Sequence, residues 1–516
     1  MSPPAVEASP SPSPSPAPSS SPPAAADWSA RSDHLNAILV REVQQAVKGR
    51  AFAMTILIAL TVVIVVATRT MGRARYATTP GREVFDAGLA LLAPLILFVV
   101  PMQAFQSMRL ELRSGIVEQL LLTRLSPRAI LAGKLQAAMV QFVLYVSLLS
   151  PLLATSYLLR GIDLPTIGLT MVFGFVMCLV ATAFAVSSAA QAMLPSLQAI
   201  ANLATAFGLG ILTVMTMAFV ASSGYSRAMA WWWSSGTVLP VASGIVLLAV
   251  LTMLLSLLVA RCHLLHAFEN RSTGFRALLF ACLPLAVAWV FGCNEARHRA
   301  SLLLGLGAGL LVVAAAFALF LVTEPRALSV RVRAHVPGNG LAALLASPFL
   351  PGRDRGLLSL LLFCVLLVPV FLLGSTLASS SLRAEWGLRF LALGGTYTMI
   401  YAALLHWLRG RLPETQGGSH TARFLAPVLI AAACIVPALV DVFVRGEVDD
   451  WHVGHALNPF WTINHLLWQQ ERWAKWMPVV LLALVAVVTW RLPAMLRGVA
   501  EVQRAASARR RGQIDA

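Results

Sequence analysis

Long apolar runs separated by short polar segments dominate this chain. A helix needs about 20 apolar residues to cross a hydrocarbon core. Twelve such runs lie near residues 51–68, 86–106, 135–158, 166–190, 198–221, 239–260, 277–293, 302–323, 357–378, 390–408, 424–443 and 476–493. They lack the alternation of barrel strands, and a helix satisfies its backbone hydrogen bonds internally. The pattern predicts an all-α polytopic membrane protein with about twelve transmembrane helices.

Polar segments at the two ends predict three further regions. Residues 1–30 consist largely of Pro, Ser and Ala, which predicts a disordered tail. Residues 31–50 carry apolar positions three and four apart, which is typical of an amphipathic interfacial helix. Residues 494–516 end in a run of arginines, and we expect a solvated basic tail there.

The composition agrees with a membrane protein. Hydrophobic residues make up 58% of the 516 residues and charged residues only 12%, against roughly 25% charged residues in soluble domains. The net charge of +17 is scattered over short loops. A nucleic-acid binder gathers its basic residues on one folded face, so we expect contact with the lipid bilayer and no nucleic acid.

Lys and Arg also indicate the orientation, because loops rich in them stay in the cytoplasm. With a cytoplasmic N-terminus, about two thirds of the 39 basic residues fall in cytoplasmic segments. This predicts a multi-pass protein of the cell (inner) membrane with both termini cytoplasmic. The first outer loop is the exception, since Arg69, Arg73, Arg75 and Arg82 fit the opposite orientation better.

Residues 109–134 form a charged segment between the second and third runs. Charged positions alternate there with leucine, isoleucine and valine, which predicts a short amphipathic helix. Ser126 and Pro127 end it, because proline disfavours helix in the preceding residue and suits the first turn of the next helix. The segment is either a plain connector or a docking element that a cytosolic machine moves.

The same segment resembles the first cytoplasmic loop of the transmembrane permease subunits of type-two ABC transporters. The matching positions are Glu111, Gly115, Glu118, Leu120, Leu121, Thr123, Ser126, Gly133 and Lys134, in the family's spacing and without a gap. Arg113, Ile116, Val117 and Arg124 depart from the family's residues. The surrounding segments are also similar, with an amphipathic helix before the first span and a short outer break at residues 222–236.

This resemblance implies a six-span permease core at residues 51–276, with its coupling loop at 107–134. Residues 277–493 form a second six-span half that matches no motif and shows no evident repeat of the first. The implied activity is export across the inner membrane, driven by a separate ABC ATPase. The implied docking residues are Glu111, Arg113, Gly115, Glu118, Leu121, Thr123, Arg124 and Ser126. The pair of permease halves would come from a homodimer, a second permease, or the chain's own second half.

The chain has no recognisable ATP site. A phosphate-binding loop needs the pattern GxxxxGK followed by Ser or Thr, whereas Lys134 is followed by Leu135 and the first glycine is replaced by Arg128. We therefore expect no cofactor in this chain, with ATP and Mg²⁺ bound by the partner. The chain itself is expected not to be an enzyme.

Other readings remain open at this point. Ionisable residues are scarce within the spans, which disfavours ion-coupled transport, and Asp441 with Arg445 fits a helix pair. Asp449, Asp450, His452, His455 and His465 are metal-capable, but their loop predicts no metal site. The alternatives to export are a membrane scaffold or mechanical subunit moved by an ABC ATPase, and an enzyme acting on lipid-linked groups. The sequence does not identify substrate-binding residues.

Overall fold

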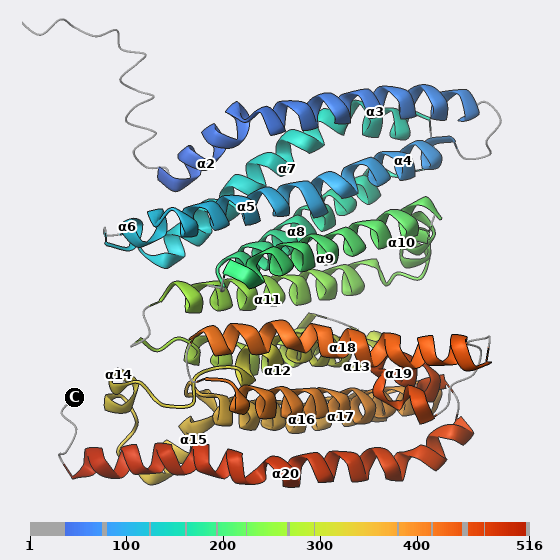
Figure 1. Ribbon diagram of the computed structural model, residues 1–516. Coiled ribbons are helices and arrows are strands. Elements are labelled where there is room, and N and C mark those ends of the chain that lie inside the picture. Colours follow the sequence, from blue (N-terminus) through green and yellow to red (C-terminus); the bar gives the residue numbers. More distant parts are fainter. Residues whose placement is uncertain are drawn as a thin grey trace, which may run out of the picture.

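The computed structural model describes residues 37–74, 80–122, 125–159, 162–191, 195–222, 224–265, 269–293, 295–378, 381–413, 416–445, 453–468 and 470–511. These residues form helices and no strand. Twelve of the helical segments are long and apolar enough to cross a membrane, and each coincides with one of the twelve predicted runs. Figure 1 shows the long helices side by side in one layered bundle. The prediction of an all-α polytopic membrane protein is confirmed.

The first half begins with a short helix and continues through six spans. Its elements are α2 (Ala37–Lys48), α3 (Arg50–Ala74), α4 (Pro80–Pro94), the π-helix η1 (Leu95–Val99), α5 (Val100–Arg113), α6 (Ile116–Leu122), α7 (Pro127–Leu158), α8 (Leu164–Ala189), α9 (Pro195–Ala221), α10 (Gly224–Ser234) and α11 (Val238–Leu264). The elements α4, η1 and α5 make one continuous span. The π turn lies just before Pro101, whose missing N–H removes a bond from a regular helix.

The second half contains the remaining six spans. Its elements are α12 (Thr273–Cys293), α13 (Ala296–Val322), α14 (Val330–Ala334), α15 (Gly340–Ala346), η2 (Ser347–Phe349), α16 (Arg353–Thr376), α17 (Ser381–Arg411), α18 (Gln416–Arg445), η3 (Val453–Leu457), α19 (Pro459–Trp468) and α20 (Gln470–Arg510). We call the two ends of the bundle the α6 side and the α10 side. In Figure 1, α2, α6, α14, α15 and the end of α20 lie on the α6 side, and α10 and α19 on the other.

The two halves repeat one packing scheme. In each, the second span packs against the first, third, fourth and fifth, and the sixth packs against the third and fourth. Short helices join the second and third spans on the α6 side, namely α6 in one half and α14 to η2 in the other. Short helices also join the fifth and sixth spans on the α10 side, namely α10 and η3 with α19. The sequence showed no repeat, because many apolar sequences satisfy the same helix packing.

The halves meet through unlike faces. The sixth span of the first half, α11, packs against α12 and α13, the first two spans of the second half. Small residues permit the close approach: a Cβ added at Gly309 of α13 would lie 2.7 Å from Leu248 of α11, and one at Gly244 would lie 3.2 Å from Trp289. The contact is therefore heterologous rather than a twofold pairing of like faces.

Part of the predicted C-terminal tail packs on the protein, although Arg510 and Arg511 are exposed as expected of a solvated tail. Helix α20 continues to Arg510. Its Val502, Ala505 and Ala506 are buried with apolar residues of α14 and its flanks, and Arg509 Nη1 donates to the Val336 carbonyl at 2.8 Å. Burial of these small apolar residues extends the helix past the membrane. The amphipathic helix predicted over 31–50 is confirmed over Ala37–Lys48, whereas the predicted tail at residues 1–30 lies outside the described residues.

Candidate functional site on the α6 side

Helix α6 lies between two local boundaries, a turn at Gly115 and a helix cap at Ser126. Gly115 separates it from α5 and has a φ of 72°, a conformation that favours glycine because it has no Cβ. After α6, the Ser126 side chain caps α7 by accepting from the Ala129 N–H at 3.3 Å. Pro127 takes the first position of α7, as the sequence predicted. Both boundaries are local features of the chain.

Helix α6 has one buried and one exposed edge. Val117 is buried in the core of the first half, and Leu121 packs against the same core. Glu118 and Gln119 are exposed, and Leu122 is 88% exposed. Val117 therefore couples α6 to the core, while Glu118 and Leu122 lie on its exposed edge.

Next to the junction of α5 and α6, four charged residues and one serine from three helices form what we call the Lys134 cluster. Its members are Arg41, Glu42, Ser107, Glu111 and Lys134. Lys134 Nζ lies 2.8 Å from Glu42 Oε1 and 3.0 Å from Glu111 Oε2. It also donates to Ser107 Oγ at 2.8 Å, and Arg41 pairs with Glu111. The cluster ties α2, α5 and α7 together.

The cluster balances its charges in a buried place. Two bases face two carboxylates, and Lys134 is only 1% exposed. Charges removed from water require partners of opposite sign and hydrogen bonds to offset their desolvation. Removing Lys134 would leave Glu42 and Glu111 with only the partly exposed Arg41 as a base, so the cluster favours one relative position of the three helices.

A cleft of about 580 Å³ lies beside the cluster. Its wall combines the cluster with residues of α2, α5, α7 and the start of α6, including Gln103 and Gln141. Gln141 Oε1 is buried and accepts no hydrogen bond from the residues described. The cleft therefore combines the buried charges of the cluster with uncharged polar side chains.

The predicted docking residues fall into different environments. Glu111 is buried in the Lys134 cluster, and Ser126 serves as the cap of α7. Arg113 and Glu118 are exposed, Gly115 forms the turn, and Leu121 packs inward. Thr123 and Arg124 lie outside the described residues.

Sequence reasoning missed Arg41, Glu42 and Ser107. The pattern of residues 31–50 predicted an interfacial helix that contains Arg41 and Glu42, without a role for either. The available signal was Lys134, which lies seven residues inside α7. A charge placed that far into a span requires a partner.

On the α10 side, helix α10 is attached to the ends of two spans. Tyr225 Oη and Thr170 Oγ1 are 2.8 Å apart, and Ser226 Oγ donates to Asp86 Oδ2 at 3.1 Å. Burial raises the pKa of Tyr225 to about 12, so the phenol stays neutral at physiological pH. These bonds fix the segment that the resemblance placed at residues 222–236.

The second half has its own charged network on the α6 side. Arg276 is fully buried, and its Nη2 lies 2.8 Å from Glu324 Oε2. Arg355 Nη1 lies 2.9 Å from Glu501 Oε2 of α20, and His406 Nε2 lies 2.8 Å from Asp354 Oδ1. Like Glu111, Glu324 lies at the end of the second span of its half and pairs with a base from an earlier helix. The repeat therefore extends to the charged ends.

Near the α10 side, Asp441 contacts His455, which the sequence did not predict as its partner. Asp441 Oδ2 is 2.5 Å from His455 Nε2, and His455 stacks on Trp461. The predicted partner, Arg445, has no described side chain. Among the residues described, no three His, Cys, Asp or Glu side chains form a metal-binding group; Asp449, Asp450 and His452 lie outside them.

The chain matches no protein-family model, no curated protein and no solved structure.

Proposed function

We propose that this chain is the permease subunit of an ATP-binding cassette exporter, driven by a separate ATPase that docks on α6. The supporting observation is the Lys134 cluster, which links the region behind α6 to three helices at once. A plain connector between two spans needs no such buried network. The proposal also rests on the resemblance of residues 109–134 to the coupling loop of type-two permeases.

The proposed mechanism is a lever. The ATPase pushes the exposed edge of α6, and Val117 passes the motion to the core while Gly115 serves as the pivot. Glu111 at the end of α5 then moves with Lys134 of α7 and Arg41 of α2, so α2 and the second and third spans shift together. Such rigid motion of packed helices is a known way to switch between inward- and outward-facing states.

The positions of the buried charges favour an external source of energy. Asp86, Lys134, Asp354, His406 and Asp441 lie within about one to two turns of a helix end. Proton- or sodium-coupled transporters keep ionisable residues along the ion pathway inside the membrane. The hydrolysis of ATP, with Mg²⁺, would take place in the partner chain.

The α6 side is proposed to face the cytoplasm of the cell (inner) membrane. Its loops carry most of the basic residues. With twelve spans, both ends of the chain are then cytoplasmic, on the side where the ATPase binds ATP.

The second copy of a permease half is proposed to come from another chain. Two halves that enclose a pathway pair through like faces around a twofold axis. Within this chain the halves meet as α11 against α12 and α13, which leaves α3 and α9 of the first half free to pair. A homodimer of this chain then binds two ATPases.

The docking step is tested by charge reversal at Glu118. The chain is coexpressed with a candidate ABC ATPase, and Glu118→Lys is compared with Glu83→Lys. Glu83 is an exposed glutamate on the α10 side, so Glu83→Lys makes the same charge change on the opposite side of the membrane. We expect Glu118→Lys alone to lose the ATPase on copurification, and equal recovery from both variants would refute docking at α6.

Export is distinguished from a scaffold role by turnover in proteoliposomes. An exporter should show ATPase activity stimulated by a transported lipid or hydrophobic drug, together with movement of that compound. ATPase binding without stimulation or movement by any compound would favour a mechanical subunit.

A further inference from the structure

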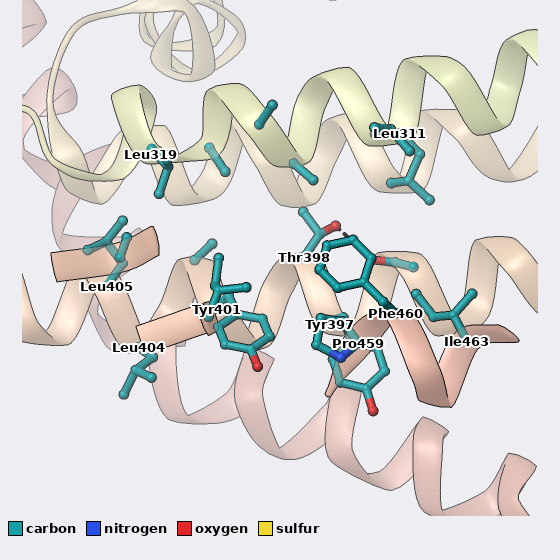
Figure 2. Close-up of a pocket in the computed structure, with 18 of the residues that line it drawn as sticks. Leu311, Leu319, Tyr397, Thr398, Tyr401, Leu404, Leu405, Pro459, Phe460 and Ile463 are labelled. Carbon is teal, nitrogen blue, oxygen red and sulfur yellow. Dashed lines mark hydrogen bonds between the residues drawn. The ribbon is translucent and has the colours of Figure 1, made fainter. Parts of the chain in front are cut away.

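A slot of about 330 Å³ lies inside the second half, between α13, α17, α18 and α19. Figure 2 shows Leu311 and Leu319 on one wall and Tyr397, Tyr401 and Phe460 facing them. The lining of α17 extends from Phe390 to Leu405, which is roughly 22 Å of helix at 1.5 Å per residue. This stretch falls within the candidate span Glu385–Arg411 and is shorter than a hydrocarbon core of about 30 Å.

The wall offers no free hydrogen-bonding group from the side chains of α17. Thr398 Oγ1 donates to the Gly394 carbonyl at 2.7 Å. The hydroxyls of Tyr397 and Tyr401 donate to the Ala456 and Leu457 carbonyls, each at 2.5 Å. The remaining lining is almost entirely leucine, alanine, isoleucine, valine and phenylalanine. A polar ligand would lose its bonds to water without replacement, so the occupant must be apolar.

Helix α19, on the α10 side, forms the floor of the slot. Pro459, Phe460 and Ile463 of α19 line it. Non-helical backbone at membrane depth is tolerated only where protein groups satisfy it, and Tyr397 and Tyr401 do so for η3. The His455 to Asp441 contact fixes the same segment to α18. The slot is thus formed by the fold and does not depend on an occupant.

The mouth of the slot opens toward lipid. Val312 is 58% exposed and Leu429 is 38% exposed, and both line the slot on outward-facing helices. The surrounding solvent at this depth consists of acyl chains, and water would find no polar partner in the slot. An acyl chain can enter sideways from the bilayer without crossing a polar barrier.

We propose that this slot binds one acyl chain of a membrane lipid. The acyl chain lies along α17 beneath α19, and the headgroup of the lipid stays outside the slot. This site is independent of ATPase docking, since it lies in the second half and involves no residue of the Lys134 cluster. It assigns the second half a lipid-binding role of its own.

The test uses a phosphatidylethanolamine with a photoreactive diazirine in one acyl chain. The full chain is reconstituted with this lipid and irradiated, and labelled peptides are identified by mass spectrometry. Ala315→Phe fills the slot from a partly exposed position, and Ala432→Phe places the same side chain on the exposed face of α18 outside the slot. Val312→Trp blocks the mouth in a second way.

We expect labels to concentrate on the slot residues of α13 and α17. Ala315→Phe and Val312→Trp should reduce that labelling about tenfold, as expected when roughly two buried methylene groups are excluded, while Ala432→Phe leaves it unchanged. Labelling spread evenly over all lipid-facing helices would overturn the proposal. Labelling at the slot that persists in both blocking variants would overturn it as well.

Discussion

Lys134 of α7 and Glu42 of α2 are 92 positions apart in the chain, yet Nζ of the lysine lies 2.8 Å from Oε1 of the glutamate. Their contact attaches the short helix before the first span to the third span. Glu111 of α5 shares the same lysine at 3.0 Å. Because the three groups are buried, the position of each helix depends on the other two.

Replacing Lys134 with methionine should destabilise the first half. The change leaves Glu42 and Glu111 with only the partly exposed Arg41 as a base, and breaking a buried pair costs about 3 to 5 kcal/mol. Thermal unfolding of the purified chain measures the loss, with Arg128→Met, an exposed base on the same helix, as the control. Adding Glu42→Gln and Glu111→Gln to Lys134→Met should recover much of the stability. An unchanged unfolding temperature for Lys134→Met alone would show that the cluster is not structural.

Replacing Gly115 with alanine should strain the turn between α5 and α6. An L-residue in the left-handed region costs about 1 to 2 kcal/mol, and the φ of 72° places Gly115 there. We expect a lower unfolding temperature and weaker stimulation of the partner ATPase. Gly208→Ala is the matched control, because it lies within α9 and an added Cβ meets nothing within 4 Å. Equal effects of the two changes would argue against a special turn at Gly115.

Replacing Tyr397 with phenylalanine should loosen η3. The partly buried Ala456 carbonyl loses its donor, and leaving such an acceptor unsatisfied costs about 1 kcal/mol. Hydrogen exchange of the η3 amides should rise in Tyr397→Phe. Tyr157→Phe removes a hydroxyl from a residue that is 50% exposed and should leave η3 unchanged. Unaltered exchange in Tyr397→Phe would mean that the segment is held by other contacts.

Cysteine labelling should report which side faces the cytoplasm. Ser114 on the α6 side and Ser234 on the α10 side are both exposed, and each is replaced by cysteine in a background lacking Cys293, Cys364 and Cys434. A membrane-impermeant maleimide added to intact cells should label Ser234→Cys alone, and inverted vesicles should give the reverse. The opposite result would invert the proposed orientation and account for the arginines after the first span.

The complex should contain two copies of this chain and two ATPase subunits. The heterologous contact of α11 with α12 and α13 leaves the first half without a twofold partner inside the chain. Native mass spectrometry of the complex measures the stoichiometry. One chain bound to two ATPases would instead mean that α14 to η2 acts as a second docking element.

The sequence by itself determined the elements of this protein. The lengths of the apolar runs placed twelve spans, since a helix in lipid satisfies its own backbone. The pair Ser126 and Pro127 marked the end of the segment that holds α6, because such caps depend on neighbouring residues. The amphipathic spacing likewise placed α2.

Only the tertiary structure decided how these elements meet. The partners of Lys134 and Asp441, the folding of α20 onto α14 and the shared packing scheme of the two halves arise from residues far apart in the chain. An isolated charge in a sequence shows that a partner is needed but not which residue supplies it. Apolar packing is also satisfied by many side-chain combinations, so the repeat left no trace in the sequence and is evident only in the fold.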